Sequence, residues 1–332
     1  MLTKLEEKIK LINSNENIFI SIACYRDSEL IPTILSAYHN ANKPNNLYFG
    51  ICLQYKATED TFDFDSLPND INIKIKKVKW YKARGPMYAR YLINQYLLKD
   101  EKYYLQIDSH TKFIKGWDTF HINELATLPL YSVLSTYPPG YHRNKKLIER
   151  KNINVLKYKK LLRGVPIFKT IQKQINKPER NLFWAAGYSF SNSIIFKKIP
   201  FDKYLKNIFM GEEFLIALRF YTNNINVYTP SKNMVYTLWD RDYRPTFWEI
   251  RRKNKLKFNL MAFLSYSRFL KICNFYNPSI LQDIISFKLE KYTIGNHQTI
   301  QSFLKETGIE KNIHETNYKK QYLKYYFSLN ND

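Results

Sequence analysis

The stretch YYLQIDSHTKF, residues 103–113, joins an apolar run to an abrupt polar end. Its first five residues fit a buried strand, and Asp108, Ser109 and His110 follow directly. A loop after a strand frees side chains from strict alternation, so a carboxylate and an imidazole two residues apart can turn toward one cation. The stretch therefore predicts a ligand site at the end of a central strand.

Strand and helix patterns alternate on the N-terminal side of this stretch. Strands are predicted for residues 17–25, 45–55, 71–81 and 102–107, and helices for residues 2–13 and 26–41. A further helix begins at Gly85-Pro86 and is expected to bury Tyr88, Tyr91, Leu92 and Tyr96 on one apolar face. This order predicts an α/β fold with an open mixed sheet flanked by helices.

Ligands of open α/β sheets bind beyond the carboxyl ends of the strands. Tyr25, Arg26 and Asp27 follow the first predicted strand, as Asp108 and His110 follow a later one. The two strand ends are therefore expected to share a site.

The C-terminal half is expected to hold a strand pair at residues 182–196, a helix at 211–224 with Phe214, Leu215 and Leu218 facing the core, and a long helix at 246–273. The predicted domains are a catalytic domain at residues 1–250 and a helical C-terminal extension at 251–332. Residues 142–180 are the most basic segment. They are either a solvated insertion, which we favour for most of the lysines, or a basic loop over the site that contacts an anionic or glycan acceptor.

Charge and cysteine content restrict the partners and the compartment. The 52 Lys and Arg residues against 29 Asp and Glu residues give a formal charge of +23. This excess favours nucleic acid, nucleotide phosphates or an acidic membrane face, although codon bias toward lysine explains part of it. Three cysteines without metal-like spacing and the lack of a signal sequence or spanning segment predict a cytoplasmic protein, with peripheral contact to the inner membrane face as an option.

Oxygen and nitrogen donors together suit Mn²⁺ or another divalent ion that also takes diphosphate oxygens. This is the chemistry of a D-x-H site for a nucleotide-sugar, in which the ion neutralises the leaving diphosphate. The three residues alone are weak evidence, because a surface loop with Asp and His is common. No Ser-His-Asp order, Walker loop or G-x-G-x-x-G motif is present, which disfavours hydrolase, kinase and dehydrogenase functions.

Seven further stretches carry a resemblance that runs through most of the chain: IFISIACYRDSEL, KARGPMYAR, STYPPGY, FWAAGYSFS, FMGEEFLIALRFYTNNINVYTP, RDYRPTFW and IGNHQTIQSFLKETGIE. With the D-S-H stretch, they resemble the GT-A-type glycosyltransferases that transfer N-acetylglucosamine (GlcNAc) from UDP-GlcNAc, a family that includes cytoplasmic hydroxyproline-modifying enzymes. The polypeptide GalNAc-transferases are more distantly similar. The resemblance implies a GT-A-like fold, a UDP-sugar donor and Mn²⁺ or Mg²⁺ on the diphosphate.

The resemblance also implies roles for individual residues. Asp108 and His110 match metal ligands, and Glu212 and Glu213 match the catalytic segment. The matched donor-binding residues are Ala23, Tyr25, Arg26, Arg84, Gly85, Arg90, Ser109, Trp184 and Gly187. The residues matched to the sugar or acceptor are Trp117, Asp118 and Arg241.

Two matched positions leave alternatives open. One of Glu212 and Glu213 is expected to complement a helix dipole, and the other, with Glu212 as first choice, to position a sugar or acceptor hydroxyl. Thr237 stands where relatives have a metal-binding histidine. Asp240, Asp242 or water then completes the site, or metal binding is weaker.

The sequence thus predicts a retaining glycosyltransferase that moves a sugar, GlcNAc first, from a UDP-sugar to a hydroxyl acceptor. A glycan or lipid-linked precursor of bacterial surface polysaccharide or lipopolysaccharide is the preferred acceptor, and a protein hydroxyl is the alternative. A basic nucleic-acid-binding protein is a competing hypothesis, disfavoured by the acids at the site. A relative that binds the nucleotide without turnover is the third.

Overall fold

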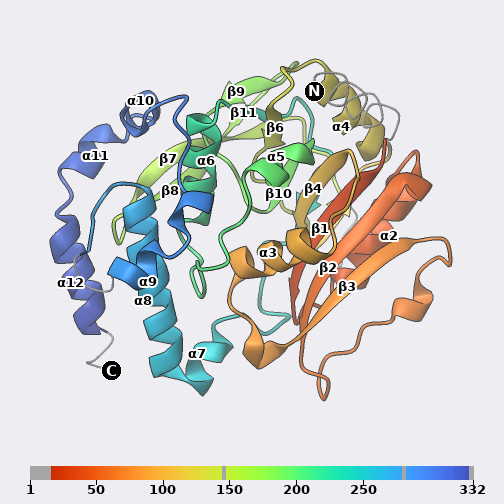
Figure 1. The fold of residues 1–332 in the computed structure, drawn as a ribbon. Helices are drawn as coiled ribbons and strands as arrows, with labels where there is room; N and C mark the ends of the chain where they lie inside the picture. Colours follow the sequence, from red (N-terminus) through yellow and green to blue (C-terminus); the bar gives the residue numbers. More distant parts are fainter. Residues whose placement is uncertain (1–15, 144–146, 279–281, 329–332) are drawn as a thin grey trace, which may run out of the picture.

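The computed structural model describes residues 16–143, 147–278 and 282–328. The helix predicted at residues 2–13 lies outside these ranges. An eight-stranded sheet forms the centre of the molecule, in the order β3-β2-β1-β4-β10-β6-β11-β9 (Figure 1). Its strands are β1 (Ile18–Tyr25), β2 (Leu47–Tyr55), β3 (Asn72–Lys79), β4 (Tyr103–Asp108), β6 (Ser132–Ser135), β9 (Glu179–Asn181), β10 (Tyr188–Asn192) and β11 (Asn226–Thr229).

The sheet is mixed, as predicted. Strands β1 to β4 pair in parallel, whereas β10 runs antiparallel to both β4 and β6. Two small sheets accompany it: β5 (Thr111–Phe113) pairs with β12 (Val235–Thr237), and β7 (Ile153–Leu162) pairs with β8 (Val165–Lys173). The β5–β12 pair continues directly from the D-S-H stretch, so it holds the exit of β4 in place.

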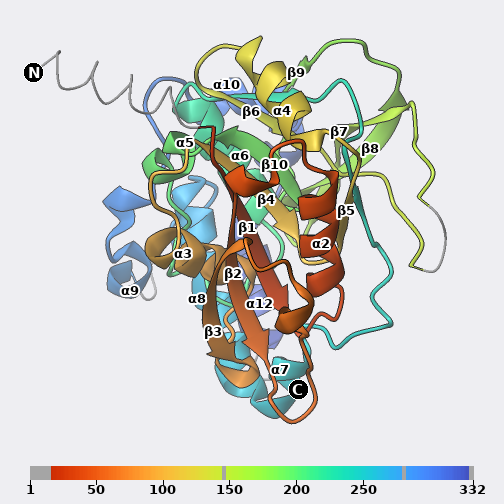
Figure 2. The ribbon, with the colours of Figure 1, turned by 90° about the vertical axis from the view of Figure 1, so that its right-hand side faces the viewer.

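Helices α2 (Leu30–Asn40) and α3 (Pro86–Tyr96) cover opposite faces of the parallel strands (Figure 2). Alternation along β1 explains this arrangement, since Ile18, Ile20 and Ile22 join the core beside α2 while Phe19 joins the core beside α3. The predicted face of α3 is partly wrong. Leu92 is buried, but Tyr96 is 51% exposed and lies under the Lys76 ammonium.

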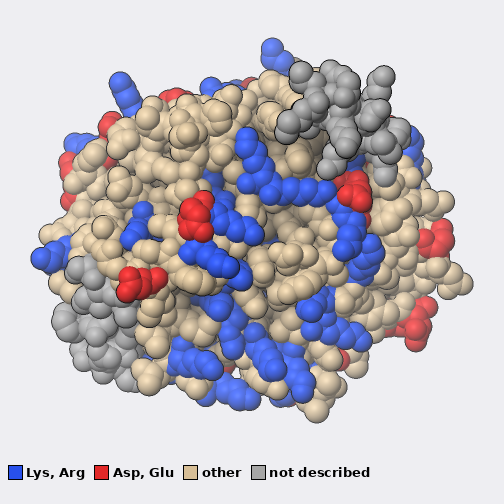
Figure 3. Space-filling view, viewed as in Figure 1, with Lys and Arg blue, Asp and Glu red and all other residues tan. Residues whose placement is uncertain are grey.

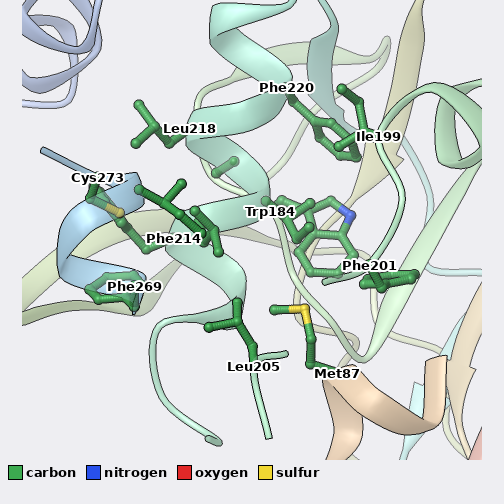
Figure 4. Close-up of a cluster of buried hydrophobic side chains, with 14 of the residues drawn as sticks. Met87, Trp184, Ile199, Phe201, Leu205, Phe214, Leu218, Phe220, Phe269 and Cys273 are labelled. Atoms are coloured by element: carbon green, nitrogen blue, oxygen red, sulfur yellow. The ribbon is translucent and has the colours of Figure 1, made fainter. Parts of the chain in front are cut away.

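Helix α6 (Glu212–Thr222) is buried on almost every side. It forms the centre of the core that also contains Phe19 and the buried face of α3. Phe214, Leu215 and Leu218 face this core, which confirms the prediction for 211–224. Figure 4 shows Phe269 and Cys273, from the end of α8 (Lys255–Ile272) and the residue after it, packed toward Phe214. Residues of α8 and of the helices that follow it thus share one core with α6.

The remaining helices are α4 (Trp117–Ala126), α5 (Ile194–Lys198), α7 (Glu249–Lys253), α9 (Gln282–Ser286), α10 (Ile300–Glu306), α11 (Glu310–His314) and α12 (Tyr318–Ser328). Short 3₁₀ turns lie at Pro44–Asn46, Phe64–Ser66, Trp80–Lys82 and Leu289–Lys291. Within the described ranges, no helix is both long enough and apolar enough to cross a bilayer.

Three predicted elements differ from the structure. The strand pair at 182–196 is one strand, β10, followed by α5, because the side chain of Asn181 accepts hydrogen bonds from the backbone of Leu182 and Phe183 and so stabilises a loop. The long helix at 246–273 is broken at Asn254, whose side chain caps the start of α8 by accepting from Lys257 N. The basic segment at 142–180 contains the β7–β8 hairpin.

Candidate active site

A crevice of about 450 Å³ opens at the carboxyl ends of β1 and β4. The strand register places Ala23 of β1 opposite Asp108 of β4, so the two polar strand ends meet there, as the topology predicted. Most of the predicted site residues line this crevice: Ala23, Tyr25, Gly85, Arg90, Asp108, Ser109, His110, Gly187, Glu212, Glu213 and Arg241.

Asp108 and His110 face each other on the crevice floor. The Nε2 atom of His110 lies 3.9 Å from Asp108 Oδ2, and the Asp108 side chain is 35% exposed. Gly187 keeps the carboxylate accessible, because a Cβ atom at this position would lie 3.0 Å from Asp108 Oδ2. One carboxylate oxygen and one imidazole nitrogen can therefore approach a common ion.

Asp27 organises this pair; the sequence placed it at the shared strand ends but gave it no role. Its buried carboxylate accepts hydrogen bonds from Ser109 Oγ at 2.6 Å and from Tyr243 OH at 2.9 Å, and it lies 2.8 Å from His110 Nδ1. Burial alone would raise the pKa of Asp27, but the His110 hydrogen bond and the Arg244 charge lower it below its ordinary value. An ionised Asp27 can accept a hydrogen bond from His110 Nδ1, and this contact orients Nε2 toward Asp108.

The donor set fits a divalent ion with two protein ligands. Among the described residues, no group of three or more His, Cys, Asp or Glu side chains is arranged to hold a metal. Thr237 is buried beside Thr111 in the β5–β12 pair, and its Oγ1 has no hydrogen-bond partner. Asp240 and Asp242 are exposed and do not line the crevice. Asp108 and His110 would therefore need diphosphate oxygens or water to complete the coordination.

Glu212 and Arg90 form a buried ion pair at the start of α6. Arg90 Nη1 donates to Glu212, while Arg90 Nη2 donates to the Ala186 carbonyl and lies 3.7 Å from Asp108 Oδ1. Burial raises the pKa of Glu212, although the Arg90 charge opposes the effect. Arg90 thus connects the acid of α6 to the acid of β4, and Glu212 is fixed in orientation.

Glu213 occupies a different environment from its neighbour. Its Oε1 accepts from Ala186 N at 2.9 Å, and its Oε2 accepts from the Tyr137 hydroxyl. Burial raises the pKa of Glu213 from 4.5 to about 7. A carboxyl group with this pKa exchanges a proton near neutral pH, a property typical of acid–base residues in active sites.

Two predicted donor-binding arginines make other contacts. Arg26 is buried between carboxylates and binds Asp60, Glu249 and Glu59. Arg84 donates to the backbone carbonyls of Tyr81 and Ala83 and does not line the crevice. Among the described residues, the arginines that line the crevice are Arg90, Arg241 and Arg244, so the structure does not place Arg26 and Arg84 on its wall.

Three other predicted residues lie in the protein interior. Trp184 is fully buried, donates to Ser189 Oγ and packs in the α6 core, as Figure 4 shows. Trp117 is equally buried and donates to the Ala37 carbonyl, and Asp118 accepts from the backbone of residues 42 and 43. These contacts stabilise the fold, so the predicted contact of Trp117 and Asp118 with sugar or acceptor is not supported.

The structure also brings unpredicted residues to the crevice. Pro166, Ile167 and Phe168 of β8 line one wall, so the basic hairpin reaches the site with apolar residues rather than with its lysines. Trp239, Phe247 and Trp248 line another wall. Phe247 and Trp248 belong to the stretch RDYRPTFW, which carried the family resemblance, but sequence spacing gave no sign of which aromatic rings face the cavity.

This arrangement of an open mixed sheet, flanking helices and a polar crevice at the strand ends is the GT-A-type glycosyltransferase fold. The GalNAc-T7 structure, described as containing UDP, GalNAc and Mn²⁺, superposes with a TM-score of 0.58 at 13% identity. The match covers 90% of this chain and 58% of that one, so the chain spans little more than half of that relative. A second structure, TarS residues 1–349 from S. aureus, is 13% identical with a TM-score of 0.45, covering 94% of this chain and 90% of that one.

The family model described as "Glycosyltransferase (GlcNAc)" matches residues 17–66 and 64–313. The chain therefore belongs to this glycosyltransferase family. A comparison with curated protein sequences found no match. The recognised family and the GT-A-like fold class are both confirmed.

Proposed function

We propose that the protein transfers GlcNAc, with retention of anomeric configuration, from UDP-GlcNAc to a hydroxyl group of a glycan or lipid-linked acceptor. The observation that carries the proposal is the convergence of the Asp108 carboxylate and His110 Nε2 at the end of β4, inside a crevice lined by Arg90, Arg241 and Arg244. The family description supports GlcNAc as the sugar.

Each part of the crevice has a chemical role in this proposal. Asp108 and His110 would hold Mn²⁺ or Mg²⁺, and the ion would neutralise negative charge on the diphosphate. Arg241 and Arg244 offer further positive charge toward the phosphates. Gly85 and Gly187 allow the backbone to approach the donor closely.

Glu213 is the proposed acid–base group, and Glu212 is the proposed positioning residue. The pKa of Glu213 is raised to about 7, and its carboxyl group lies in the crevice, where Tyr137 OH and Ala186 N donate to it. Glu212 is engaged by Arg90 and fixes the guanidinium beside Asp108. This assignment reverses the preference for Glu212 that the sequence suggested.

A donor screen tests the proposed function. Purified protein with Mn²⁺ is incubated with UDP-GlcNAc, UDP-GalNAc or UDP-glucose, and UDP release is measured with and without oligosaccharide acceptors. We expect release from UDP-GlcNAc, and an α-linked product by NMR if the configuration is retained. Calorimetric UDP binding without release from any donor would instead identify a protein that binds the nucleotide without turnover. Transfer to protein hydroxyls but to no glycan would favour the protein-acceptor alternative.

We also propose peripheral contact with an anionic membrane surface on the cytoplasmic side. Leu256 and Leu260 lie one turn apart on α8 and are 71% and 50% exposed. Arg252, Lys253 and Lys255 lie beside them, and Figure 3 shows Lys and Arg gathered over this part of the face. Exposed leucines flanked by cations suit the interface of an anionic bilayer.

Sedimentation with vesicles tests this contact. Phosphatidylglycerol vesicles should retain the protein and phosphatidylcholine vesicles should not. The double variant Leu256→Ser, Leu260→Ser should lose retention, whereas Leu130→Ser, at an equally exposed leucine on another surface, should not. Equal retention by both kinds of vesicle would contradict the proposal.

A further inference from the structure

A second cavity, of about 600 Å³, adjoins the candidate active site. It lies between the tip of the β7–β8 hairpin, α8 and α12, and it shares Phe209, Met210 and Trp248 with the crevice. Met210 directly precedes the Gly211-Glu212-Glu213 segment. A molecule in this cavity therefore lies across the shared wall from the reacting end of the site.

The hairpin tip is fixed against the helices that enclose the cavity. Arg163 and Gly164 both have positive φ and form a two-residue turn between the strands. The hydroxyl of Tyr266 in α8 donates to the Arg163 carbonyl, and that of Tyr318 in α12 donates to the Gly164 carbonyl, each at 2.9 Å. The cavity is thus a preformed feature of the fold.

The charged groups that line the cavity are all cationic. Arg163, Arg251 and Lys324 line it, and no carboxylate is among its described lining residues. They come from three separate elements, the hairpin tip, α7 and α12. Cations that converge from different elements make a local positive potential that selects anions.

The rest of the lining suits a sugar chain. Asn259 and Gln321 supply amide groups; Asn259 Oδ1 accepts from Arg251 Nε at 2.9 Å, so Asn259 offers its amide NH₂ group as a donor. The Oδ1 atom of Asn207 is buried without a hydrogen-bond partner, and this residue also lines the cavity. Trp248, which is 45% exposed, and Phe258 add aromatic surface. The volume lies within the range of about 300–1,000 Å³ found for ligand pockets.

We propose that this cavity is the acceptor subsite and that it takes an anionic glycan, one carrying carboxylate or phosphate groups. The proposal rests on the proposed glycosyltransferase function and adds the chemical class of the acceptor. The glycan lies between the hairpin tip and α12, with its reactive hydroxyl group reaching over Met210 toward Glu213.

Binding measured by calorimetry on the UDP-saturated protein tests the proposal without requiring turnover. The probes are a hyaluronan tetrasaccharide with carboxylates, phosphomannopentaose with a phosphate, and neutral chitotetraose. At least one anionic probe should bind about tenfold more tightly than chitotetraose, with an affinity that falls as salt is added. The anionic probe that binds better identifies the natural anion. An oligothymidylate is included as a nucleic-acid probe.

Variants then locate the binding. The double variant Arg163→Gln, Lys324→Gln should weaken anionic-glycan binding about tenfold and leave UDP affinity unchanged. The matched control Lys169→Gln, Lys320→Gln removes exposed cations from the same hairpin and the same helix outside the cavity, and it should change neither affinity.

Four results would overturn the subsite: equal binding of chitotetraose, equal loss in the control variant, tighter binding of oligothymidylate at the same residues, or UDP binding with no glycan binding. Failure of the proposed function is distinct, since it is the absence of UDP binding and of UDP-sugar turnover.

Discussion

The Glu213→Gln substitution should make the stability of the protein less sensitive to pH. In the folded protein the pKa of Glu213 is raised from 4.5 to about 7, because the carboxyl group is buried. A difference of this size corresponds to about 3 kcal/mol in favour of the protonated form in the native state. This contribution to stability is fully present below the unfolded-state pKa and is lost as the pH rises through about 7. Glutamine keeps the shape of the side chain and carries no charge at any pH.

The assay is urea unfolding across the pH range, applied to the parent protein and to Glu213→Gln. The control variant is Glu315→Gln, which changes an exposed acid at the C-cap of α11. At about pH 4, below the unfolded-state pKa, parent and Glu213→Gln should have similar unfolding free energies, and by about pH 8.5 the variant should be more stable by up to about 3 kcal/mol. The difference between the curves removes the contributions of other titrating groups. Parallel curves, or a variant that loses stability as the pH rises, would refute the assignment of a raised pKa to Glu213.

Three further substitutions test other parts of the structure. Asp27→Asn should weaken Mn²⁺ affinity by about 10–100-fold in calorimetry, because it removes the charge that orients His110, whereas Asp70→Asn, at an exposed acid, should not. Gly50→Ala should lower the unfolding free energy by about 1–3 kcal/mol, because its Cβ atom would lie 2.1 Å from Phe19 Cζ in the core; an unchanged urea midpoint would contradict this packing. Trp117→Phe should lower thermal stability yet leave the UDP affinity unchanged in calorimetry, and a selective loss of UDP binding would return Trp117 to the site.

The fold was predictable because its strands are apolar runs and their order is simple. Residues 17–25 and 102–107 are buried strands in the structure, and their polar ends meet at one edge of the sheet. Elements were misjudged where a single side chain decides the backbone. Asn181 turns the chain into a loop before β10, and Asn254 ends one helix and caps the next. Local hydrogen bonds of this kind leave little trace in hydrophobic periodicity.

The location of candidate site residues was predictable where they lie at a strand end. Asp108 and His110 face each other on the crevice floor. Arg26 does not line the crevice, because three carboxylates from distant segments bind its guanidinium. Asp27 was expected near the site but its role was not predicted, because that role depends on contacts with Ser109, His110 and Tyr243. Such contacts between distant segments exist only in the folded chain.

UDP release from UDP-GlcNAc measures whether Asp108 and His110 support metal-dependent use of a UDP-sugar. The parent should release UDP with Mn²⁺ and not with a chelator. Asp108→Asn should lower the rate on the order of 100-fold without changing the unfolding temperature. Asp240→Asn, at a nearby exposed acid outside the crevice, should behave as the parent. Equal rates with and without Mn²⁺, or parental activity in Asp108→Asn, would contradict the account.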